Sequence, residues 1–373
     1  MKIVYCIAGT YNSGGMERVL ANKANYLVNH GYEVSIITTD QRGRQPFFYL
    51  DKRIRCYDLN INYEINNGKS FFNKLTHYPL KQKRHRERLT AYLKQLKADI
   101  VISMFCNDAS FLWKIKDGSK KILEIHFSRY KRIQYGRTGI WKQVDHLLSW
   151  RDSEIVRKYE RFVVLTKEDK TYWGDLSNIM VIPNALSFSM SQPAELKNKK
   201  VIAIGRYDYQ KGFDYLIATW AIVHRLYPDW KLDIIGNGEW KNRLQKQIEE
   251  LGLTDAITLK LPTDHIEEVY TQASLFTMSS RYEGLPMVLL EAQSSGLPIV
   301  SFACKCGPRD VISDGEDGYL VPEGNLSIFA ERILALIADE GLRKRMGEAA
   351  RKKSQRFLEP VIMAQWESLF RQL

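Results

Sequence analysis

One stretch of the sequence, SLFTMSSRYEGLPMVLLEAQSSGLPIVSF at residues 274–302, outlines a strand, a helix and a second strand. Its two ends, 274–278 and 297–302, are short apolar runs of the kind that form strands buried on both faces of a parallel sheet. Between them, Pro286 suits the first turn of a helix and Gly296 suits the end of one. The strand–helix–strand order is typical of a βαβ unit, so this stretch predicts a parallel α/β sheet.

Further apolar runs of the same kind occur along the chain, and helical patterns separate them. One series lies at residues 2–8, 33–39, 99–105, 121–126 and 161–166, and a second lies at 201–205, 232–236, 256–260, 274–278 and 297–302. A polar stretch at 187–200 stands between the two series and has the composition of a linker. We therefore expect two doubly wound α/β domains, at residues 1–190 and 191–355. Residues 356–373 predict an amphipathic helix that either packs back on the first domain or is a plain capping helix.

The composition is that of a globular protein kept in a reducing compartment. Of the 373 residues, 45% are apolar and 26% are charged, which is ordinary for globular domains. The five cysteines are scattered and odd in number, so we expect a cytosolic chain without disulfides. No apolar run approaches the roughly 20 residues that cross a bilayer.

The charge is distributed unevenly between the two halves. Residues 1–190 carry a formal net charge of +14, whereas the remainder carries −2. Because net charge bears on partners rather than on fold, the first half is expected to meet nucleic acid, a membrane surface or a phosphorylated substrate. No nucleic-acid-binding motif accompanies the charge, so we expect no nucleic-acid partner.

Two carboxylates flank the start of the predicted helix at 286–296. Glu283 precedes the helix, and Glu291 lies eight residues further along, within it. The first N–H groups of a helix have no acceptor inside the helix, and its dipole favours an anion at that end. The free N–H groups expected here belong to Leu285, Met287 and Val288. The arrangement predicts a diphosphate site with a carboxylate on each side, one for the hydroxyls of a sugar and one for those of a ribose.

Two cations follow the strand predicted at 201–205. Arg206 comes directly after Gly205, and Lys211 with Gly212 opens the next helix. Cations at the mouth of a strand, beside glycines that allow close backbone approach, form an anion clamp, although two plain surface cations would look the same. Ligands of such sheets bind at the carboxyl ends of the strands, and with two domains the crevice between them is the expected site.

With these motifs, the chain resembles the family 4 retaining glycosyltransferases of the GT-B fold over nearly its whole length. The matching residues are Gly14-Gly15-Met16-Glu17-Arg18, Gly205-Arg206 with Lys211-Gly212, Glu283 with Glu291, and CGPRDVISDGEDGYLVPEGN at 306–325. The resemblance implies two Rossmann-like domains that face each other across a cleft. It also implies an enzyme that moves a hexose or an N-acetylhexosamine from a UDP-sugar to an acceptor.

The resemblance assigns roles to individual residues. Gly14 and Gly15 would approach the donor diphosphate, and Arg206 and Lys211 would neutralise it as it leaves. Glu283 and the backbone at Gly284 would hold the donor sugar, Glu291 would hold the ribose, and the base would lie near Lys260 and Leu261. His126, at the end of the strand predicted at 121–126, matches the family's histidine near the donor sugar and the acceptor. The catalytic residues implied are His126, Arg206, Lys211 and Glu283.

No required metal or other cofactor is expected. The chain contains no Asp-x-Asp pair of the kind that holds a sugar nucleotide through a metal. Cys304 and Cys306 have the wrong spacing for a zinc knuckle, and IGNGEW at 235–240 lacks the third glycine of a dinucleotide fingerprint. No carboxylate is placed as a nucleophile, so we expect front-face transfer in which the leaving phosphate helps to deprotonate the acceptor, giving an α-linked product.

The acceptor is predicted from the basic first half. Residues 69–97 contain nine Lys and Arg but one acidic residue, and residues 126–150 interleave cations with aromatic rings. Basic plus aromatic composition is typical of a surface that meets anionic lipid, although a solvated basic helix remains the alternative. The chain also resembles bacterial enzymes that extend lipid-linked oligosaccharides. We therefore expect an enzyme at the cytoplasmic face of the plasma membrane and a polyprenyl-diphosphate-linked glycan acceptor, bound by Lys81, Lys83, Arg84, Arg86 and Arg88.

Three other functions fit the same sequence. A transferase with a soluble acceptor would need no basic membrane face. A GT-B enzyme of another kind, such as a sugar-nucleotide epimerase, would turn over the donor without an acceptor. A subunit that only binds a sugar nucleotide would not turn it over at all.

Overall fold

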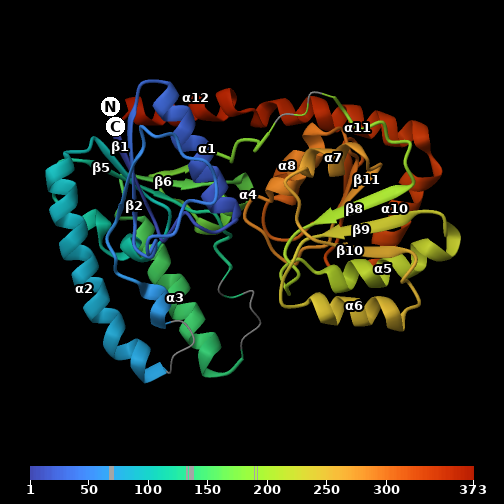
Figure 1. The fold of residues 1–373 in the computed structure, drawn as a ribbon, viewed down its shortest axis with the longest axis horizontal. Coiled ribbons are helices and arrows are strands. Elements are labelled where there is room, and N and C mark those ends of the chain that lie inside the picture. Colours follow the sequence, from blue (N-terminus) through green and yellow to red (C-terminus); the bar gives the residue numbers. More distant parts are fainter. Residues whose placement is uncertain (67–70, 132, 134–137, 189, 191) are drawn as a thin grey trace. The chain divides into compact units, whose positions relative to one another are not determined.

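The computed structural model describes residues 1–66, 71–131, 133, 138–188, 190 and 192–373. The chain divides into two compact units, each built around its own sheet (Figure 1). Unit 1 comprises Met1–Leu165, Lys170–Ile182 and Met363–Leu373, and unit 2 comprises Thr166–Asp169 and Pro183–Ile362. Lys69, Tyr135 and Arg137, which belong to the two basic stretches, lie outside the described residues.

Unit 1 contains a parallel sheet of seven strands in the order β3-β2-β1-β4-β5-β6-β7. The strands are β1 (Lys2–Ile7), β2 (Glu33–Thr38), β3 (Arg55–Asp58), β4 (Ile100–Ser103), β5 (Lys120–Glu124), β6 (Arg161–Val164) and β7 (Ile179–Val181). The α-helices are α1 (Gly15–Asn29), α2 (Phe71–Leu96), α3 (Ile140–Val156) and α4 (Lys167–Trp173), which begins in unit 2. Short 3-10 helices cover Tyr63–Asn66, Asn107–Ser110 and Leu112–Lys114. The strand order reverses between β1 and β4, as in doubly wound folds.

Unit 2 contains a parallel sheet of six strands in the order β10-β9-β8-β11-β12-β13. The strands are β8 (Lys200–Ile204), β9 (Lys231–Ile235), β10 (Ile257–Lys260), β11 (Leu275–Met278), β12 (Ile299–Phe302) and β13 (Gly318–Val321). The α-helices are α5 (Phe213–Leu226), α6 (Lys241–Glu250), α7 (Ile266–Thr271), α8 (Met287–Ser294), α9 (Pro308–Val311), α10 (Leu326–Ala338), α11 (Glu340–Ser354) and α12 (Glu359–Arg371), with a 3-10 turn at Gln355–Phe357. Helices α5 and α6 lie on one side of the sheet, and α7 and α8 lie on the other (Figure 1).

The central strands are buried on both faces, as their unbroken apolar runs predict. In unit 1, consecutive residues Ile3, Val4 and Tyr5 of β1 are all fully buried. A core of unit 1 joins alternate strand residues such as Val4 to Leu89 and Leu93 of α2. Because side chains alternate across a strand, each central strand must have a helix layer on both sides, which is the doubly wound arrangement.

Three edge elements are absent from the sequence-based prediction. Strands β3, β7 and β13 have only three or four residues each, and all three residues Arg55–Tyr57 of β3 are exposed. A short strand with exposed residues has no apolar run, so periodicity does not reveal it. Residues Arg55–Asp58 form a strand because they pair with β2, and not because of their own composition.

The last helix belongs to both units. Residues from Met363 onward count with unit 1, where the rings of Trp366 and Phe370 contact Lys23 and Tyr32 respectively. The main part of unit 1 ends at Ile182, and the first residue of the second domain predicted from the sequence, residue 191, lies outside the described residues.

Candidate functional site

The candidate site of unit 2 lies where the strand order reverses. Strands β8 and β11 are neighbours there, and the chain leaves β8 toward α5 and β11 toward α8. Connections that leave adjacent parallel strands toward opposite faces open a crevice at their carboxyl ends. Most of the donor-binding residues predicted in this half occur in these two loops and in the first turn of α8, where Met287 and Val288 lie.

Glu283 and Lys211 form an ion pair between the two loops. Lys211 Nζ lies 2.6 Å from Glu283 Oε1, and the two side chains are 16% and 7% exposed. Gln210 Nε2 donates to Glu283 Oε2 at 3.3 Å and to the carbonyl of Tyr282 at 3.0 Å. Both carboxylate oxygens therefore have a donor, and a negative charge is held in place at low solvent exposure. The sequence brought Glu283 and Lys211 to one site, but it gave no sign of Gln210.

The loop that carries Glu283 is fastened at its backbone. The Glu283 N–H donates to the Lys305 carbonyl at 2.8 Å, and the Cys306 N–H donates to the Glu283 carbonyl at 3.1 Å. Helix α8 then begins at Met287, so Pro286 is its N-cap residue rather than part of its first turn. This end of the helix follows directly on Gly284 and Leu285, as the anion site predicted from the sequence requires.

Gly307 packs against the same loop in a conformation that other residues rarely adopt. Its φ is +102°, and a Cβ built on it would lie 2.5 Å from Pro286 Cδ and 2.9 Å from the Gly284 oxygen. Neither neighbour is the end of a flexible chain, so the loop before α8 would have to shift. The glycine therefore allows the 306–325 stretch to close on the start of α8.

We expect Gly307→Ala to lower the stability of the protein by about 2 kcal/mol or more, because the substitution combines backbone strain with a steric clash. For a unit of 150–250 residues, the range into which unit 2 falls, that corresponds to a fall in the Tm of its unfolding transition of roughly 4–8 °C, measured by calorimetry. Gly315→Ala is the matched control, because its φ is +80° and nothing lies within 4 Å of its Cβ. Equal shifts for the two variants would contradict the packing role of Gly307.

A second ion pair, not foreseen from the sequence, holds the two loops together. Arg281 Nη1 and Nη2 donate to Asp214 Oδ1 and Oδ2 at 3.0 and 2.8 Å. The guanidinium also lies 4.3 Å from the ring centroid of Tyr209 and 4.1 Å from that of Tyr215. A bidentate pair between stacked rings has little freedom, so it fixes the loop that carries Glu283. The partners are 67 residues apart, and no local pattern links them.

Glu291 lies inside α8 with its side chain almost fully buried. It is 6% exposed, and the Tyr270 hydroxyl donates to its Oε2 at 2.8 Å. Tyr270 comes from α7, which the sequence did not place near Glu291. A carboxylate has about four lone-pair sites, so this bond leaves Glu291 able to accept from ribose hydroxyls. That role stays a prediction.

The other cations predicted for the donor are more exposed. The Arg206 side chain is 73% exposed, with Nε 3.3 Å from Asp208 Oδ2. Lys260 is 46% exposed and pairs with Asp233 at 2.7 Å, and Leu261 beside it is exposed. The carbonyl of Lys260 lies 2.8 Å from the Tyr207 hydroxyl, whose pKa burial raises to about 12. Tyr207 thus stays neutral. Its hydroxyl also donates to the carbonyl of Ile234 in β9, so it links the carboxyl ends of β9 and β10.

The predicted site residues of unit 1 follow β1 and β5. Gly14 is the N-cap of α1, and a Cβ on it would meet the Glu17 carboxylate, whereas nothing lies within 4 Å of a Cβ on Gly15. The Glu17 carboxylate is the end of a flexible side chain and can move, and the space beside Gly15 is open, so the donor contacts of Gly14 and Gly15 stay predictions. His126 lies two residues beyond the end of β5, and its side chain is 6% exposed.

Comparison with known proteins decides the family. The chain matches the family descriptions "Glycosyltransferase Family 4" at residues 13–189 and "Glycosyl transferases group 1" at residues 188–353. It is 30% identical to an uncharacterized glycosyltransferase of Haemophilus influenzae, with 99% of each chain covered. This chain is a family 4 glycosyltransferase. The family expected from the motifs is thereby confirmed, and the chain is an enzyme that uses nucleotide-sugar donors.

Two other relatives of this family 4 glycosyltransferase have more specific names. The amylovoran biosynthesis glycosyltransferase AmsD of Erwinia amylovora is 30% identical, with 99% of each chain covered. An α-1,4-N-acetyl-D-galactosaminyltransferase of Campylobacter jejuni, named for a glycan on undecaprenol diphosphate, is 27% identical and covers 99% of this chain and 98% of its own. Among solved structures, the sucrose-phosphate synthase of Thermosynechococcus elongatus has a TM-score of 0.83 at 18% identity, covering 100% of this chain and 98% of its own. The expected GT-B fold is confirmed.

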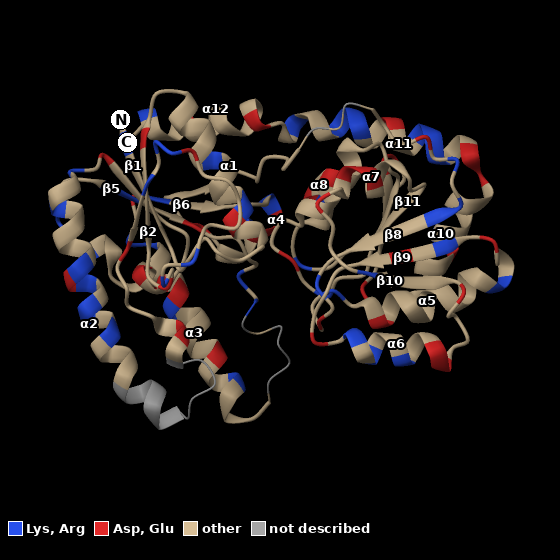
Figure 2. Cartoon of the chain, in the orientation of Figure 1, with Lys and Arg blue, Asp and Glu red and all other residues tan. Residues whose placement is uncertain are grey.

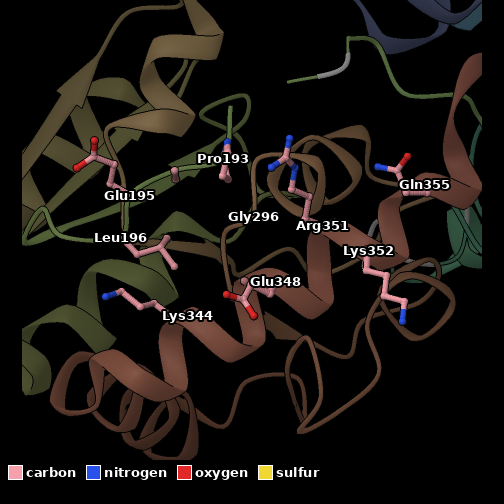
Figure 3. A pocket seen from close by; sticks show the side chains of 11 residues that line it. Pro193, Glu195, Leu196, Gly296, Lys344, Glu348, Arg351, Lys352 and Gln355 are labelled. Carbon is pink, nitrogen blue, oxygen red and sulfur yellow. The ribbon is translucent and has the colours of Figure 1, made fainter. Parts of the chain in front are cut away.

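A further cavity in unit 2 of the glycosyltransferase lies apart from the donor residues. It measures about 460 Å³ and is lined by the linker at Pro193–Leu196, by Gly296 and by α11 (Figure 3). Lys344, Glu348 and Arg351 give its wall both signs of charge. No residue predicted to contact the donor is among its lining residues. Gly347 and Gly296 bring α11 and the end of α8 together here, because a Cβ on Gly347 would lie 2.2 Å from the Gly296 oxygen.

The part of the chain that the structure describes contains neither a cluster of metal ligands nor a membrane-spanning helix. No group of three or more His, Cys, Asp or Glu side chains in this part is arranged to hold a metal ion. Within the same residues, no helix has both the length and the apolar character needed to cross a bilayer. Cys304 and Cys306 are buried and are not joined in a disulfide, and the Cys306 thiol donates to Asp169 Oδ1 at 3.4 Å.

Proposed function

We propose that this glycosyltransferase transfers a hexose or an N-acetylhexosamine from a UDP-sugar, with retention of configuration, to a lipid-linked glycan at the cytoplasmic face of the membrane. The observation that carries the proposal is the ion pair between Glu283, in the loop before α8, and Lys211, in the loop before α5. It combines a carboxylate for sugar hydroxyls with a cation for a phosphate, beside a helix N-terminus that favours anions. The geometry supports the donor half of the reaction most directly.

The donor diphosphate would lie between the start of α8 and Lys211. An ammonium has three N–H donors, so its bond to Glu283 leaves two for phosphate oxygens. Arg206, exposed at the end of β8, would supply a second positive charge, and the diphosphate contact of Gly15 stays a prediction. Glu291 would accept hydrogen bonds from the ribose, and the base would lie beside the backbone of Lys260 and Leu261.

Bond cleavage between sugar C1 and the diphosphate places negative charge on the leaving oxygens and positive character on the sugar. Lys211 and the helix N–H groups would stabilise the leaving group more strongly than the bound donor, because the charge grows along the reaction. Glu283 is already paired with Lys211 and Gln210, which suits a carboxylate that orients hydroxyls. The leaving phosphate oxygen would accept the acceptor hydroxyl proton on the same face, and the product would be α-linked.

The lipid-linked acceptor is supported by the surface of α2. Basic residues recur along this helix (Figure 2). Lys83, Arg84 and Arg86 are exposed, whereas Lys81 and Arg88 are half-buried and donate to the carbonyls of Asn62 and Leu59. We therefore assign contact with an anionic surface or a lipid diphosphate to the three exposed residues first. The name of the Campylobacter jejuni relative, which includes undecaprenol diphosphate, supports the same acceptor class.

Helix α3 adds apolar side chains to the surface of unit 1. Ile140 is 74% exposed, and Leu147 and Trp150 are both 62% exposed. Large apolar side chains that remain exposed on a helix are typical of a surface that meets a partner or a membrane interface. Together with the cations of α2, they favour a peripheral membrane enzyme over one with a soluble acceptor.

The donor half of the proposal is tested by a thermal-shift screen of the purified full chain against UDP-, GDP- and dTDP-sugars. Binding to the native state alone raises Tm, by an amount that grows with ligand concentration over Kd. We expect UDP-sugars to raise Tm and the Glu283→Ala variant to lose the additional shift that the sugar gives over UDP. The product formed with a matching acceptor should show an α-anomeric signal in NMR spectra.

The outcomes separate the remaining alternatives. A β-linked product would refute the retaining reaction, and a stronger shift from GDP- or dTDP-sugars would refute UDP. Conversion of the donor sugar without any acceptor would favour an epimerase. Binding without turnover in the presence of a panel of acceptors would favour a subunit that only binds sugar nucleotides.

A further inference from the structure

A buried group of charged side chains lies behind His126 in unit 1. Lys23 of α1 places Nζ 2.5 Å from Oε1 of Glu124, the last residue of β5. The same Oε1 lies 3.2 Å from His126 Nε2. Lys23 is 5% exposed and Glu124 is 1% exposed, so both charges are almost completely removed from water. Sequence patterns gave no reason to connect Lys23 with His126.

The ammonium of Lys23 has an aromatic enclosure. Nζ lies 3.9 Å from the ring centroid of Trp366 in α12 and 5.7 Å from that of Tyr5 in β1. The faces of these two rings attract the ammonium. Among the described residues, Glu124 is the single carboxylate that forms an ion pair with Lys23. Removing either member of such a buried pair leaves an uncompensated charge, which is strongly unfavourable.

The ionisation of Glu124 depends on the two side chains that contact it, Lys23 and His126. Burial alone opposes ionisation of Glu124, but the positive charge of Lys23 and the contacts with His126 outweigh it and lower the pKa of Glu124 to about 2. Glu124 is therefore a carboxylate throughout the physiological range, and a carboxylate oxygen only accepts hydrogen bonds. Glu17 of α1 is a further acidic group near His126, and burial raises its pKa.

Both nitrogens of the His126 ring are buried, and among the residues that the structure describes neither has a hydrogen-bond partner. They differ in their surroundings, because Nε2 lies 3.2 Å from the Glu124 carboxylate. Buried polar atoms are nearly always paired, so an unpartnered one marks a place for a group from outside the chain. If Nε2 carries the hydrogen toward Glu124, Nδ1 is the acceptor and can receive a hydrogen bond from a hydroxyl.

We propose that Lys23 and Glu124 are positioning residues that act as one unit: Lys23 keeps Glu124 in place, and Glu124 holds His126 as the Nε2–H tautomer with Nδ1 turned to a sugar hydroxyl. The inference rests on the proposed function for the identity of that hydroxyl. It adds that the histidine works only with a buried lysine 103 positions earlier in the chain, anchored by the C-terminal helix through Trp366.

The first test is spectroscopic and needs no substrate. In the full chain with ¹⁵N-labelled histidine side chains, the His126 signal is assigned among seven histidines by its loss in His126→Ala. We expect the wild type to show Nε2–H and a bare Nδ1, and both Lys23→Met and Glu124→Gln to show the other tautomer or a mixture. A wild-type spectrum with Nδ1–H overturns the proposal directly, whatever the variants do.

The second test is kinetic and uses the UDP-sugar that gives the largest thermal shift. Lys23→Met and Glu124→Gln should each lower kcat about 10- to 100-fold, the range for loss of one hydrogen bond to a charged group, with the donor KM changed less than about threefold. The double variant should lose no more than either single variant, because residues that act as a unit are not additive.

Lys121 provides the matched control at the other end of the same strand. Its Nζ lies 2.5 Å from Asp117 Oδ1, and the two side chains are 3% and 0% exposed. Lys121→Met therefore breaks an equally buried pair without touching His126, and its kcat should stay within about twofold of wild type at temperatures below its Tm. Equal losses for Lys121→Met and Lys23→Met would overturn the positioning role. An inactive wild type would instead refute the proposed function, and the tautomer experiment would still decide the inference.

Discussion

Replacing Lys211 with methionine should lower kcat for sugar transfer by about 100- to 1000-fold, the loss that follows when one preorganised charge at the leaving group is removed. The donor KM should rise much less, because the charge on the diphosphate grows as the bond to the sugar breaks. The structure places the ammonium 2.6 Å from Glu283, so the variant also removes the cationic partner of the carboxylate that we propose to bind the sugar. The measurement is the initial rate of UDP release at saturating donor.

Lys353→Met is the matched control for this experiment. Lys353 Nζ lies 3.0 Å from Asp317 Oδ2, and the side chains are 22% and 1% exposed, close to the values for Lys211 and Glu283. Both variants remove the lysine partner of a buried carboxylate in the same unit and leave that carboxylate its other hydrogen bonds, but Lys353 has no place in the proposed site. We expect Lys353→Met to lower Tm and to keep its rate. A similar loss of rate in both variants would assign the effect of Lys211→Met to folding.

Reversing the exposed cations of α2 should abolish membrane binding. Each basic residue near an anionic bilayer contributes about 1 kcal/mol, so replacing Lys83, Arg84 and Arg86 with Glu should reduce partitioning by about 100-fold or more. The measurement is cosedimentation of the full chain with vesicles of phosphatidylglycerol and phosphatidylcholine at physiological salt. Binding by the wild type should also fall as salt is raised, because surface charges are screened.

The control for this prediction reverses the same number of charges in unit 2. Lys241, Arg243 and Lys246 are exposed cations of α6, and their replacement with Glu gives the same net charge as the α2 variant. We expect the α6 variant to bind vesicles like the wild type. Equal loss in both would indicate attraction by net charge alone, and unchanged binding in both would remove α2 from the proposal.

Much of the candidate donor site could be proposed from the sequence because its signals are local. The order strand, Glu283, helix, Gly296, strand lies within 29 residues and determines one βαβ unit with its helix N-terminus. Arg206 and Lys211 likewise lie in the loop that follows a strand, between β8 and α5. Parallel strands place their carboxyl ends at one edge of the sheet, so these residues could be assigned to the same site without coordinates.

The supporting residues could not be predicted, because they depend on contacts between distant parts of the chain. Arg281 pairs with Asp214, and Tyr270 donates to Glu291, but neither partner lies at helical or strand spacing from the other. Of five cations assigned to the acceptor from composition, Lys81 and Arg88 donate to backbone carbonyls of the chain itself. A count of charges does not distinguish a cation that faces solvent from one that is already bound.

The sequence alone determined two parallel α/β sheets, the family to which the chain belongs and the strand ends at which the candidate donor residues lie, because hydrophobic periodicity and glycine spacing are written in consecutive residues. The tertiary structure decided which charges stand together. Lys23, Glu124 and Trp366 come from a helix, a strand and the far end of the chain, and they meet only once unit 1 has folded. A buried charge requires a partner, but nothing in its neighbouring residues tells which distant group that partner is.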